Sequence, residues 1–478
     1  MYIGLDLGTS GLKGLVIDER QSVVGEAHEA LTVSRPHPGW SEQAPSDWLA
    51  AAESVLDQLA KAHDLSAVRA IGLSGQMHGA TLLDASDAVL RPCMLWNDTR
   101  SHEQAAAMDA DPEFRAVTGN IVFPGFTAPK VAWVRDNEPD IFERIAKVLL
   151  PKDYLRLWLT GGYHSDKSDS AGTAWLDTGK RVWSKSLLDK TGLGMIHMPA
   201  LVDGSDVTGK LRAEIMDRWG LSGDCVVAGG GGDNAASAIG AGVTQAGEAF
   251  VSLGTSGVLF AACDAYAPAP ETAVHTFCHA LPRTWHQMGV ILSATDALNW
   301  YALLVGDDPA ALTGALGDLA APGRTLFLPY LGGERTPHND AAVRGALLGL
   351  EHASDRDAVT RAVLEGVVHA VCDCRDALAA TGTRFDRLLA VGGGAKSDYW
   401  LKALATSLQT SIDVPVAGDF GGAFGAARLA MMAAGDLDPS GLKPPPIAKT
   451  IDPDTALADA FADAHARYQT AYAQTRML

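Results

Sequence analysis

The chain has 478 residues, of which 47% are hydrophobic and 20% are charged, and this composition excludes wholesale disorder. The length predicts two domains or more, each large enough to bury a core of its own. Its 38 lysines and arginines against 57 acidic residues give a formal charge of −19, which disfavours nucleic acid and anionic membrane surfaces as partners.

The N-terminal segment and the cysteines indicate a compartment. The first residues carry no basic region and include Asp6, which is untypical of a signal or transit peptide. No stretch approaches 18 uncharged apolar residues, so we expect no membrane span. Six cysteines in a chain of this length predict reduced, mostly buried thiols. We therefore expect a cytoplasmic protein.

Hydrophobic patterns in the first hundred residues predict strands around one helix. Alternation predicts strands over residues 2–7, 12–18, 23–33, 68–73, 80–84 and 89–96. Trp48, Val55 and Leu59 follow helical spacing and predict a helix over residues 47–63. Three strands, a helix and another strand resemble the βββαβ core of the ribonuclease H-like fold.

The second half of the chain begins in the same way. We expect strands over residues 249–253, 257–262, 276–281, 286–292 and 387–391. Helical spacing predicts helices over residues 356–380, 398–408 and 423–434. A segment rich in proline and glycine, residues 437–446, separates these elements from an alanine-rich C-terminal helix.

A five-residue string links the two halves. Leu7-Gly8-Thr9-Ser10-Gly11 recurs unchanged as Leu253-Gly254-Thr255-Ser256-Gly257, in the same strand–turn–strand setting. Its place at the start of each half predicts a duplicated α/β architecture of two lobes. We expect the first lobe to span residues 1–243 and the second to span residues 244–478.

The repeated turns are candidate phosphate-binding loops. A Gly-Thr-Ser turn after a strand exposes backbone N–H groups and hydroxyls to a phosphate. Two such turns facing each other would hold a polyphosphate, through the candidate residues Gly8, Thr9, Ser10, Gly254 and Thr255. Asp6 precedes the first turn, where Ser252 precedes the second, and a carboxylate beside a phosphate loop suits Mg²⁺. For one copy alone, a β-hairpin turn without a ligand is the better explanation. Two matched copies favour phosphate binding.

A third glycine cluster, Gly392, Gly393 and Gly394, follows one predicted strand and precedes a helix. Glycines there let a flat ligand approach the backbone, and the helix N-terminus favours phosphate. Ala395 before Lys396 excludes a Walker A loop, and Ser397 excludes a dinucleotide fingerprint. A tight strand–helix turn explains this segment equally well.

The main candidate for acid–base chemistry is Asp233, which follows four glycines, residues 229–232, and precedes Asn234 and an alanine-rich helix. Asp233 could cap that helix. A cap does not need four glycines, which cost conformational entropy on folding. The carboxylate could instead take a proton from a hydroxyl that attacks a γ-phosphate. Earlier in the chain, Gln76 and His78 end a strand and offer donors and acceptors suited to sugar hydroxyls.

These motifs resemble those of the FGGY carbohydrate kinases in order and spacing along nearly the whole chain. The matching segments are Asp6–Gly11, Trp96–Asp98, Gly125–Asn137, Asp233–Asn234, Gly254–Ser256 and Gly392–Gly394. Within the family, Ser34–Gln43 and Ser74–Gly79 are most similar to the bacterial members that phosphorylate D-xylulose.

The resemblance implies two actin-like lobes with a cleft for ATP and sugar between them. It implies transfer of the ATP γ-phosphate to O5 of D-xylulose in xylose breakdown, with Asp233 as the general base and the first lobe carrying the sugar site. It places five residues at the sugar: Met77, His78, Trp96, Asn97 and Asn234. Asp6 would lie near Mg²⁺ and the phosphates as a second catalytic residue, and the second lobe would bind most of the nucleotide.

Three alternatives stay open on the sequence. One is a kinase for another ketose or polyol, such as L-ribulose, glycerol or gluconate, because a few side chains can redirect specificity. Another is an actin-like ATPase with a mechanical role, against which Asp233 and His78 speak. A nicotinamide oxidoreductase is the least favoured, for lack of a dinucleotide fingerprint. ATP, a small sugar and Mg²⁺ are the expected ligands, and a homodimer is left open.

Overall fold

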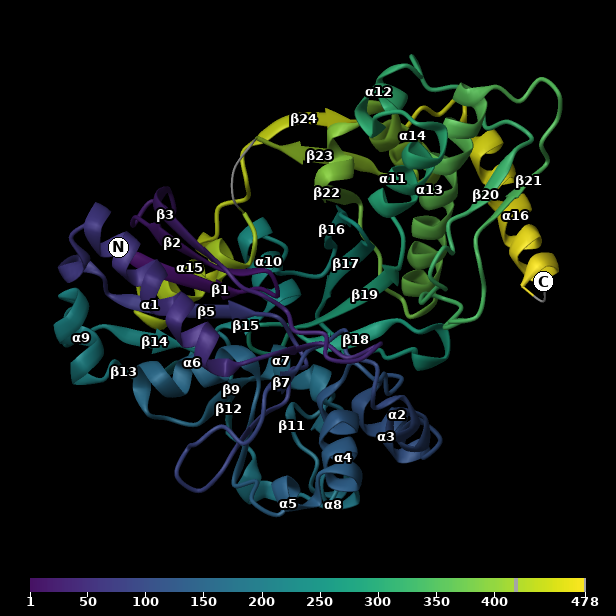
Figure 1. The fold of residues 1–478 in the computed structure, drawn as a ribbon. Coiled ribbons are helices and arrows are strands. Elements are labelled where there is room, and N and C mark those ends of the chain that lie inside the picture. Colours follow the sequence, from purple (N-terminus) through teal and green to yellow (C-terminus); the bar gives the residue numbers. More distant parts are fainter. Residues whose placement is uncertain (417–419, 477–478) are drawn as a thin grey trace.

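The computed structural model describes residues 1–416 and 420–476, which form two lobes, each around a seven-stranded sheet (Figure 1). The first sheet has the strand order β13-β14-β5-β1-β2-β3, and β15 also pairs with β5. Its strands are β1 (Tyr2–Leu7), β2 (Gly11–Ile17), β3 (Val23–Ala30), β5 (Ala70–Gly75), β13 (Val207–Lys210), β14 (Val226–Ala228) and β15 (Gly231–Gly232).

The second sheet has the order β18-β19-β17-β16-β22-β23-β24. Its strands are β16 (Glu248–Leu253), β17 (Gly257–Cys263), β18 (His275–Cys278), β19 (Trp285–Ile291), β22 (Arg387–Val391), β23 (Ser411–Pro415) and β24 (Ile447–Ile451). In both sheets a central strand pairs antiparallel with the strand after its turn and parallel with a strand from beyond a helix: β1 with β2 and β5, β16 with β17 and β22. This shared order confirms the duplication that the repeated string predicts.

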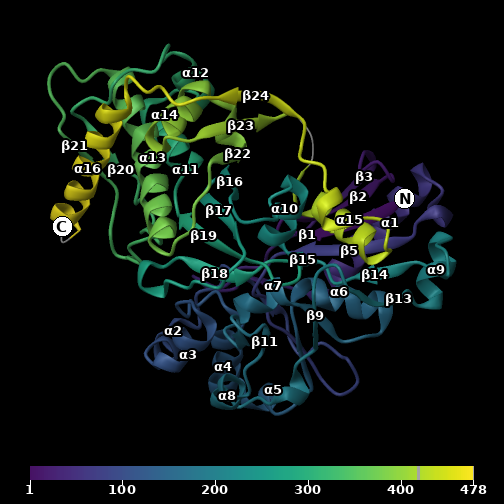
Figure 2. The same ribbon diagram turned by 180° about the vertical axis from the view of Figure 1, so that it is seen from behind.

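Helices cover the sheets, and several match the expected bounds. They are α1 (Pro45–Ala62), α6 (Pro151–Thr160), α9 (Ala213–Trp219) and α10 (Asp233–Ala241) in the first half, and α11 (Thr295–Val305), α12 (Pro309–Gly314), α13 (Arg356–Ala380), α14 (Asp398–Leu408), α15 (Gly422–Ala433) and α16 (Ala458–Thr475) in the second. Pro45 begins α1, where its missing N–H needs no partner, and Trp48, Val55 and Leu59 are buried in the core of the first lobe. The two views from opposite sides place α16 at the outer end of the second lobe, where the C-terminus lies (Figure 2).

Residues between about 77 and 202 form an additional layer below the first sheet (Figure 1). It contains α2 (His102–Asp109), α3 (Pro112–Thr118), α4 (Thr127–Asn137), α5 (Pro139–Phe142), α7 (Lys167–Ser170), α8 (Lys185–Lys190) and the short strands β6 (Thr81–Leu83), β7 (Cys93–Met94), β8 (Lys147–Leu149), β9 (His164–Asp166), β10 (Leu176–Asp177), β11 (Val182–Trp183) and β12 (Ala200–Val202). The remaining short strands are β4 (Glu42–Gln43), which pairs with β7, and the pair β20 (Leu326–Leu328) and β21 (Ala346–Leu348).

Three predicted strands differ from the structure by three residues or more at one end. The strand expected over residues 23–33 ends at Ala30. The strand expected over residues 89–96 is reduced to Cys93–Met94, because Pro92 lacks the N–H that a strand ladder uses. The strand expected over residues 276–281 begins at His275 and ends at Cys278. The six cysteines are buried free thiols, as expected. Within the described ranges, none of the helices has both the length and the apolar character needed to cross a membrane.

Helix α15, which follows the strand β23 of the second sheet, returns to the first lobe. It lies against β1 and β5 and crosses α10. Four glycines let these backbones approach: a Cβ on Gly4 would lie 1.9 Å from Ala423 O, and one on Gly72 would lie 1.9 Å from Ala426 O. Gly240 and Gly425 are equally close to backbone where α10 and α15 cross. The division expected at residues 243 and 244 therefore does not describe α15, which packs with the first sheet although it follows the second.

Candidate functional site

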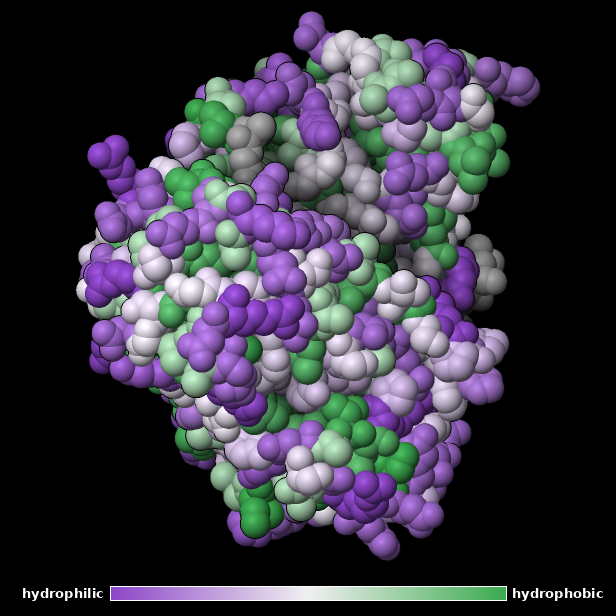
Figure 3. Space-filling view, turned by 60° about the vertical axis from the view of Figure 1, so that its left-hand side comes forward, coloured by the Kyte–Doolittle hydropathy of each residue, from purple (hydrophilic) through white to green (hydrophobic). Residues whose placement is uncertain are grey.

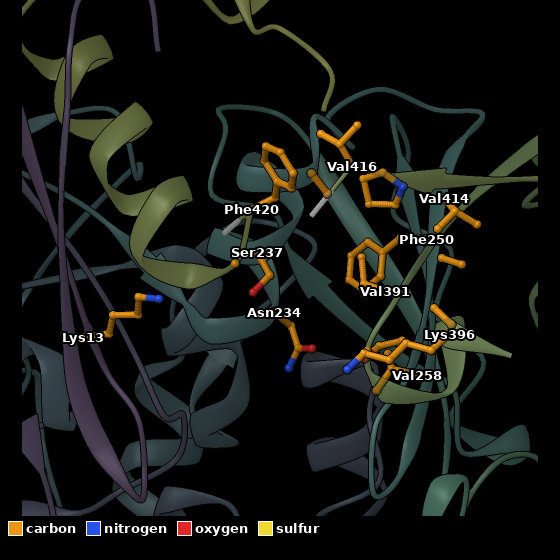
Figure 4. Close-up of a pocket in the computed structure, with 17 residues that line it drawn as sticks. Lys13, Asn234, Ser237, Phe250, Val258, Val391, Lys396, Val414, Val416 and Phe420 are labelled. Carbon is orange, nitrogen blue, oxygen red and sulfur yellow. The ribbon is translucent and has the colours of Figure 1, made fainter. Parts of the chain in front are cut away.

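A cavity of about 750 Å³ opens between the lobes, and residues from both lobes line it (Figure 4). Lys13 of β2 and Asn234 of α10 lie on the side of the first sheet, while Phe250, Val391 and Val414 come from the second sheet. The space-filling view shows the surface hollowed between the two parts of the molecule (Figure 3). The fold therefore places the junction of the duplicated halves at a ligand-sized space.

Asp233 is the first residue of α10, at this junction. Gly232 occupies the N-cap position and no side chain caps the helix, so Asp233 does not have the capping role that the sequence left open. Asn234 donates to Asp233 Oδ1 through its backbone N–H at 2.7 Å and through Nδ2 at 3.0 Å. Burial, and secondly the negative charge of Asp6, raise the pKa of Asp233 to about 7. A carboxyl group with this pKa is suited to accept a proton near neutral pH.

Two of the four glycines before Asp233 are required by close backbone contacts. A Cβ on Gly229 would lie 2.1 Å from Asp203 O, and one on Gly230 would lie 2.1 Å from Leu73 O. Gly230 also has a φ of +73°, which glycine adopts without strain. Because side chains at these two positions would collide with backbone, Gly229 and Gly230 fix the approach of this segment to β5, whereas a Cβ on Gly231 or Gly232 would meet its neighbours at 3.0 Å or more.

Arg156 of α6 holds the same segment from below, and the sequence did not reveal this role. Its guanidinium is fully buried and donates to the carbonyl of Ala228 at 2.5 Å and to that of Gly229 at 2.6 Å. Gly232 N–H donates to Ser168 Oγ at 3.1 Å. In the sequence, Arg156 is a charged residue between two leucines of the largely buried helix α6. That pattern indicates a buried charge but does not show which groups it binds.

Asp6 stands at the end of β1, close to Asp233. In the sheet register it lies opposite Ser74 of β5 and Lys13 of β2. The N-terminus of α15 also reaches this point, since a Cβ on Gly422 would lie 2.8 Å from Asp6 Oδ2. The charge of Asp6 raises the pKa of Asp233, so the two carboxylates share one electrostatic environment. Carboxylate oxygens so placed are suitable donors for a hard divalent cation.

The first Gly-Thr-Ser turn is tied into a polar network. Thr9 Oγ1 donates to Gln76 Oε1 at 2.9 Å and accepts from Trp96 Nε1 at 3.0 Å, and Gln43 Nε2 donates to Thr9 O at 2.8 Å. Gln76 is buried, and its Nε2 donates to Gln43 Oε1. Both ends of the Gln76 amide are bound within the protein, so Gln76 supports the first turn, and its role toward sugar hydroxyls stays a prediction.

The other Gly-Thr-Ser turn and the third glycine cluster lie together. Gly254 O accepts hydrogen bonds from Thr295 N and Oγ1, and Thr255 O accepts from Ala294 N. Gly392 has a φ of +91°, and a Cβ there would lie 2.7 Å from Leu253 O. The structure thus brings the residues 254–255 and 392–394 side by side in the second lobe.

A second cavity, of about 640 Å³, adjoins this glycine cluster. Gly393 and Gly394 line it together with Asn299 of α11 and Tyr399 at the start of α14. Lys396 lines both this cavity and the one between the lobes. The sequence used Lys396 only to exclude a Walker A loop and missed its position as a cation that borders both cavities.

Met77 lies beside the glycine that precedes Asp233, and the adjacent His78 lies against Gly172. A Cβ on Gly232 would lie 3.0 Å from Met77 Sδ, so the thioether covers the backbone next to Asp233. The His78 ring lies 2.7 Å through Nδ1 from Gly172 O and stacks on Phe126 with ring centroids 4.8 Å apart. Burial, and secondly Lys130, lower the pKa of His78 to about 3, so the ring is neutral. A neutral ring that donates from Nδ1 presents Nε2 as an acceptor.

Trp96 and Asn97, which the resemblance places at the sugar, differ in exposure and in hydrogen bonding. Trp96 is 49% exposed and tied to Thr9, so the structure joins it to the first turn. Asn97 is half-buried, and its Oδ1 accepts no hydrogen bond from any residue in the described ranges. The following residue, Asp98, is buried in an ion pair with Arg100. Met77, His78, Asp233 and Asn234 therefore form the compact part of the candidate site.

Comparisons with known proteins agree with this geometry. The N-terminal domain of the FGGY family of carbohydrate kinases matches residues 1–240, and the C-terminal domain of that family matches residues 249–434. The xylulose kinase of Escherichia coli (strain K12) is 49% identical over 91% of this chain and 90% of its own length. The xylulose kinase of Klebsiella pneumoniae is 46% identical over 95% of each chain.

A solved structure from Brucella ovis, described as a "xyloylose kinase", is 62% identical and superposes with a TM-score of 0.98 over 99% of both chains. The xylulose kinase of Rhodospirillum rubrum is 28% identical and has a TM-score of 0.93 over 99% of this chain and 98% of its own. The two duplicated lobes, the cleft between them and both sequence matches together show that the chain belongs to the FGGY family of carbohydrate kinases.

Proposed function

We propose that the protein transfers the γ-phosphate of ATP to O5 of D-xylulose, giving D-xylulose 5-phosphate. As a carbohydrate kinase it uses a sugar and ATP. The relatives named above support D-xylulose as the sugar. The observation that carries the proposal is Asp233, whose pKa is about 7 and whose neighbour Gly232 lies against Met77.

In this proposal the sugar lies between Asp233 and His78. Its 5-hydroxyl would face Asp233, and His78 would accept a hydrogen bond from another hydroxyl through Nε2. Met77 would supply an apolar wall that keeps water from the reacting oxygen. Asn234 would keep the carboxylate of Asp233 oriented through the two bonds it already donates. Trp96 and Asn97 would border the site on the side of the first turn.

The nucleotide would occupy the second lobe and reach into the cleft. The adenosine part fits the cavity lined by Gly393, Gly394 and Asn299. The polyphosphate would pass Gly392 and Lys396 toward the cleft, where the backbone N–H groups of residues 9–10 and 254–255 would face its oxygens. Gly8 would let the phosphate approach the turn, because its own N–H donates to Gly11 O. Lys396 lines both cavities and would neutralise part of that charge.

The donor set around Asp6 fits Mg²⁺. Asp6 and Asp233 offer carboxylate oxygens near one another, and their mutual repulsion favours a divalent cation between or beside them. Asp6 would hold the cation directly or through water. Bound there, the cation would stabilise negative charge on the phosphate oxygens.

The proposed transfer is an in-line displacement. Asp233 accepts the proton of the 5-hydroxyl as the sugar oxygen forms its bond to the γ-phosphorus. The bond from that phosphorus to the oxygen bridging the β- and γ-phosphates breaks, and ADP leaves with the electron pair. Asn234 holds the deprotonated carboxylate in place before the attack and the protonated one after it.

Each lobe would bind one of the two substrates. Residues 1–243 would form the sugar lobe and residues 244–478 the nucleotide lobe, with α15 packed on the former. We also propose a cytoplasmic location and a homodimer, which cell fractionation and light scattering of the purified protein would test.

The test of the substrate is ADP release with Mg·ATP and a panel of acceptors: D-xylulose, L-ribulose, glycerol, D-gluconate and no sugar. We expect kcat/KM for D-xylulose to exceed that for each other acceptor by about tenfold or more, because buried polar groups discriminate strongly among hydroxyl patterns. Preference for another acceptor would retain the chemistry and reject the substrate. ATP turnover that ignores every sugar would reject the kinase proposal itself.

A further inference from the structure

A guanidinium from the second lobe reaches the rings around His78. Arg335 lies in the loop between β20 and β21. Its guanidinium carbon lies 4.5 Å from the ring centroid of Phe123, and its Nη1 lies 3.5 Å from His275 Nε2. Phe123 precedes α4 in the first lobe, whereas His275 begins β18 in the second. Arg335 therefore bridges the lobes beside the proposed sugar site.

The rings that Arg335 touches continue to His78 without a break. Phe123 contacts Phe126 with ring centroids 5.7 Å apart, and Phe126 stacks on His78 at 4.8 Å. His275 contacts the same Phe126 at 6.1 Å. Arg335 also acts on His78 electrostatically, since its positive charge is one of the causes, after burial and Lys130, that lower the pKa of His78. The guanidinium therefore lies at the far side of the ring cluster that packs on His78, close enough for its charge to act on that ring.

Arg335 is half-buried and has no carboxylate partner among the described residues. Across residues 1–416 and 420–476 it forms no ion pair, whereas Arg100 pairs with Asp98 and Arg181 with Asp203. The adjacent Glu334 cannot supply the charge. Its Oε1 accepts from Leu292 N at 2.9 Å and Arg335 N at 2.7 Å, and burial raises its pKa to about 8.

A guanidinium has five N–H donors, and one long contact to His275 leaves most of them without a protein acceptor. Arg335 is half-buried, and none of its nitrogens is fully buried without a partner in the described part of the chain, so these N–H groups are open to water or to a ligand. Stacking on Phe123 uses only the flat face of the guanidinium, so its N–H groups, which lie in the plane of the group, do not point at the ring. The edge is therefore available to a ligand that supplies several oxygen atoms.

We propose that Arg335 binds the acceptor sugar from the second lobe, by donating hydrogen bonds to sugar oxygens remote from the hydroxyl that Asp233 deprotonates. This inference rests on the proposed function, because it takes the sugar to lie between His78 and Asp233. If Arg335 binds the sugar, residues of both lobes form the acceptor site. The sugar then contacts the second lobe directly, beside the rings that already join the lobes.

The first test compares Arg335→Gln and Arg335→Lys with the wild type. We expect Arg335→Gln to raise the KM for D-xylulose, and its Kd measured by calorimetry without nucleotide, about ten- to hundredfold, the usual effect of losing hydrogen bonds from a charged donor. The KM for ATP should stay within about twofold. Arg335→Lys should recover part of the sugar affinity, because it restores the charge but not the planar set of donors. The matched control is Arg344→Gln, an exposed arginine of the same loop that donates to local carbonyls.

The second test uses the unaltered protein and does not depend on how a variant folds. Phenylglyoxal modifies accessible guanidinium groups, and peptide mass spectrometry measures the extent at each arginine. D-Xylulose without nucleotide should slow modification of Arg335 and leave that of Arg344 unchanged. Equal modification of Arg335 with and without sugar, or an Arg335→Gln variant with unchanged KM and Kd for D-xylulose, would overturn the inference. The proposed function fails separately, if the wild type does not phosphorylate D-xylulose.

Discussion

Asp233 combines an ionisable group with a position that controls when it is charged. Burial disfavours its carboxylate, and the nearby charge of Asp6 disfavours it further, so its pKa rises to about 7. Two hydrogen bonds from Asn234 act in the opposite direction, because they stabilise the charged form. Near neutral pH, Asp233 is therefore present in both its protonated and its deprotonated form. A catalytic group that takes up a proton and later releases it needs such a pKa.

A prediction at the scale of this residue concerns pH. The base must be deprotonated to act, so kcat/KM for the sugar should be constant above about pH 7 and fall about tenfold per pH unit below it. Asp233→Asn should remove transfer almost completely, while D-xylulose still binds and protects the protein against thermal unfolding. Initial rates between pH 5 and 9 and a thermal-shift titration check both parts.

The control is Asp357→Asn, at an exposed aspartate in the first turn of α13, far along the chain from the cleft. It should show the wild-type pH profile. Asp233 would lose its assigned role if Asp233→Asn transferred phosphate at a near-normal rate. An activity that stayed constant down to pH 5 would contradict the raised pKa as the controlling titration.

At the scale of elements, the crossing of α10 and α15 decides where Asp233 points. These helices meet through glycines: a Cβ on Gly425 would lie 1.7 Å from Ala236 O, and one on Gly240 would lie 2.2 Å from Phe420 O. Ala423 and Ala426 of α15 lie equally close to Gly4 and Gly72 of the first sheet. Because no side chain separates these backbones, any added carbon must displace a whole helix.

We predict that Gly425→Ala lowers the free energy of unfolding by about 3 kcal/mol, as overpacking against rigid backbone does. It should also lower kcat, since α10 begins with Asp233. Gly314→Ala is the matched control: it ends α12, where no atom lies within 4 Å of the added Cβ, and it should leave stability unchanged or slightly raised. Urea unfolding measures the difference, and equal stability of the two variants would contradict the tight crossing.

The whole molecule is built around two large sheets whose central strands have the same order, and the chain crosses between them more than once. The segment from α10 to β16 leads into the second lobe, and α15 brings the chain back to the first sheet. Residues from both sheets line the cavity between the lobes. Ligands bound there must therefore respond to how the lobes sit relative to each other.

This arrangement predicts coupling between the two substrates. D-Xylulose together with a non-hydrolysable ATP analogue should raise the free energy of unfolding by more than the sum of the two separate increases, because closure over one ligand completes the site for the other. We expect an excess of about 1 kcal/mol or more, which is the lower end of typical coupling free energies. Unfolding measured with no ligand, each ligand and both ligands gives this quantity, and strict additivity would show that the lobes bind independently.

The sequence by itself determined most helices and strands, and it marked the strand ends at which the candidate functional residues lie. Alternation and helical spacing are local signals, and they located α13, β22 and α14 at the bounds the structure has. The repeated Gly-Thr-Ser string predicted two matching sheets, and the four glycines marked Asp233. These features could be read because each depends on residues adjacent in the chain.

Only the tertiary structure decided which distant residues share a space. Gln76 is bound by Thr9 and Gln43, α15 belongs with the first sheet, and Arg156 holds the glycines before Asp233. Arg335 reaches Phe123 from the other lobe. The physical reason is the same in each case: hydrogen bonds and close backbone contacts between segments far apart in the chain depend on how layers pack, and no local pattern of residue types records that packing.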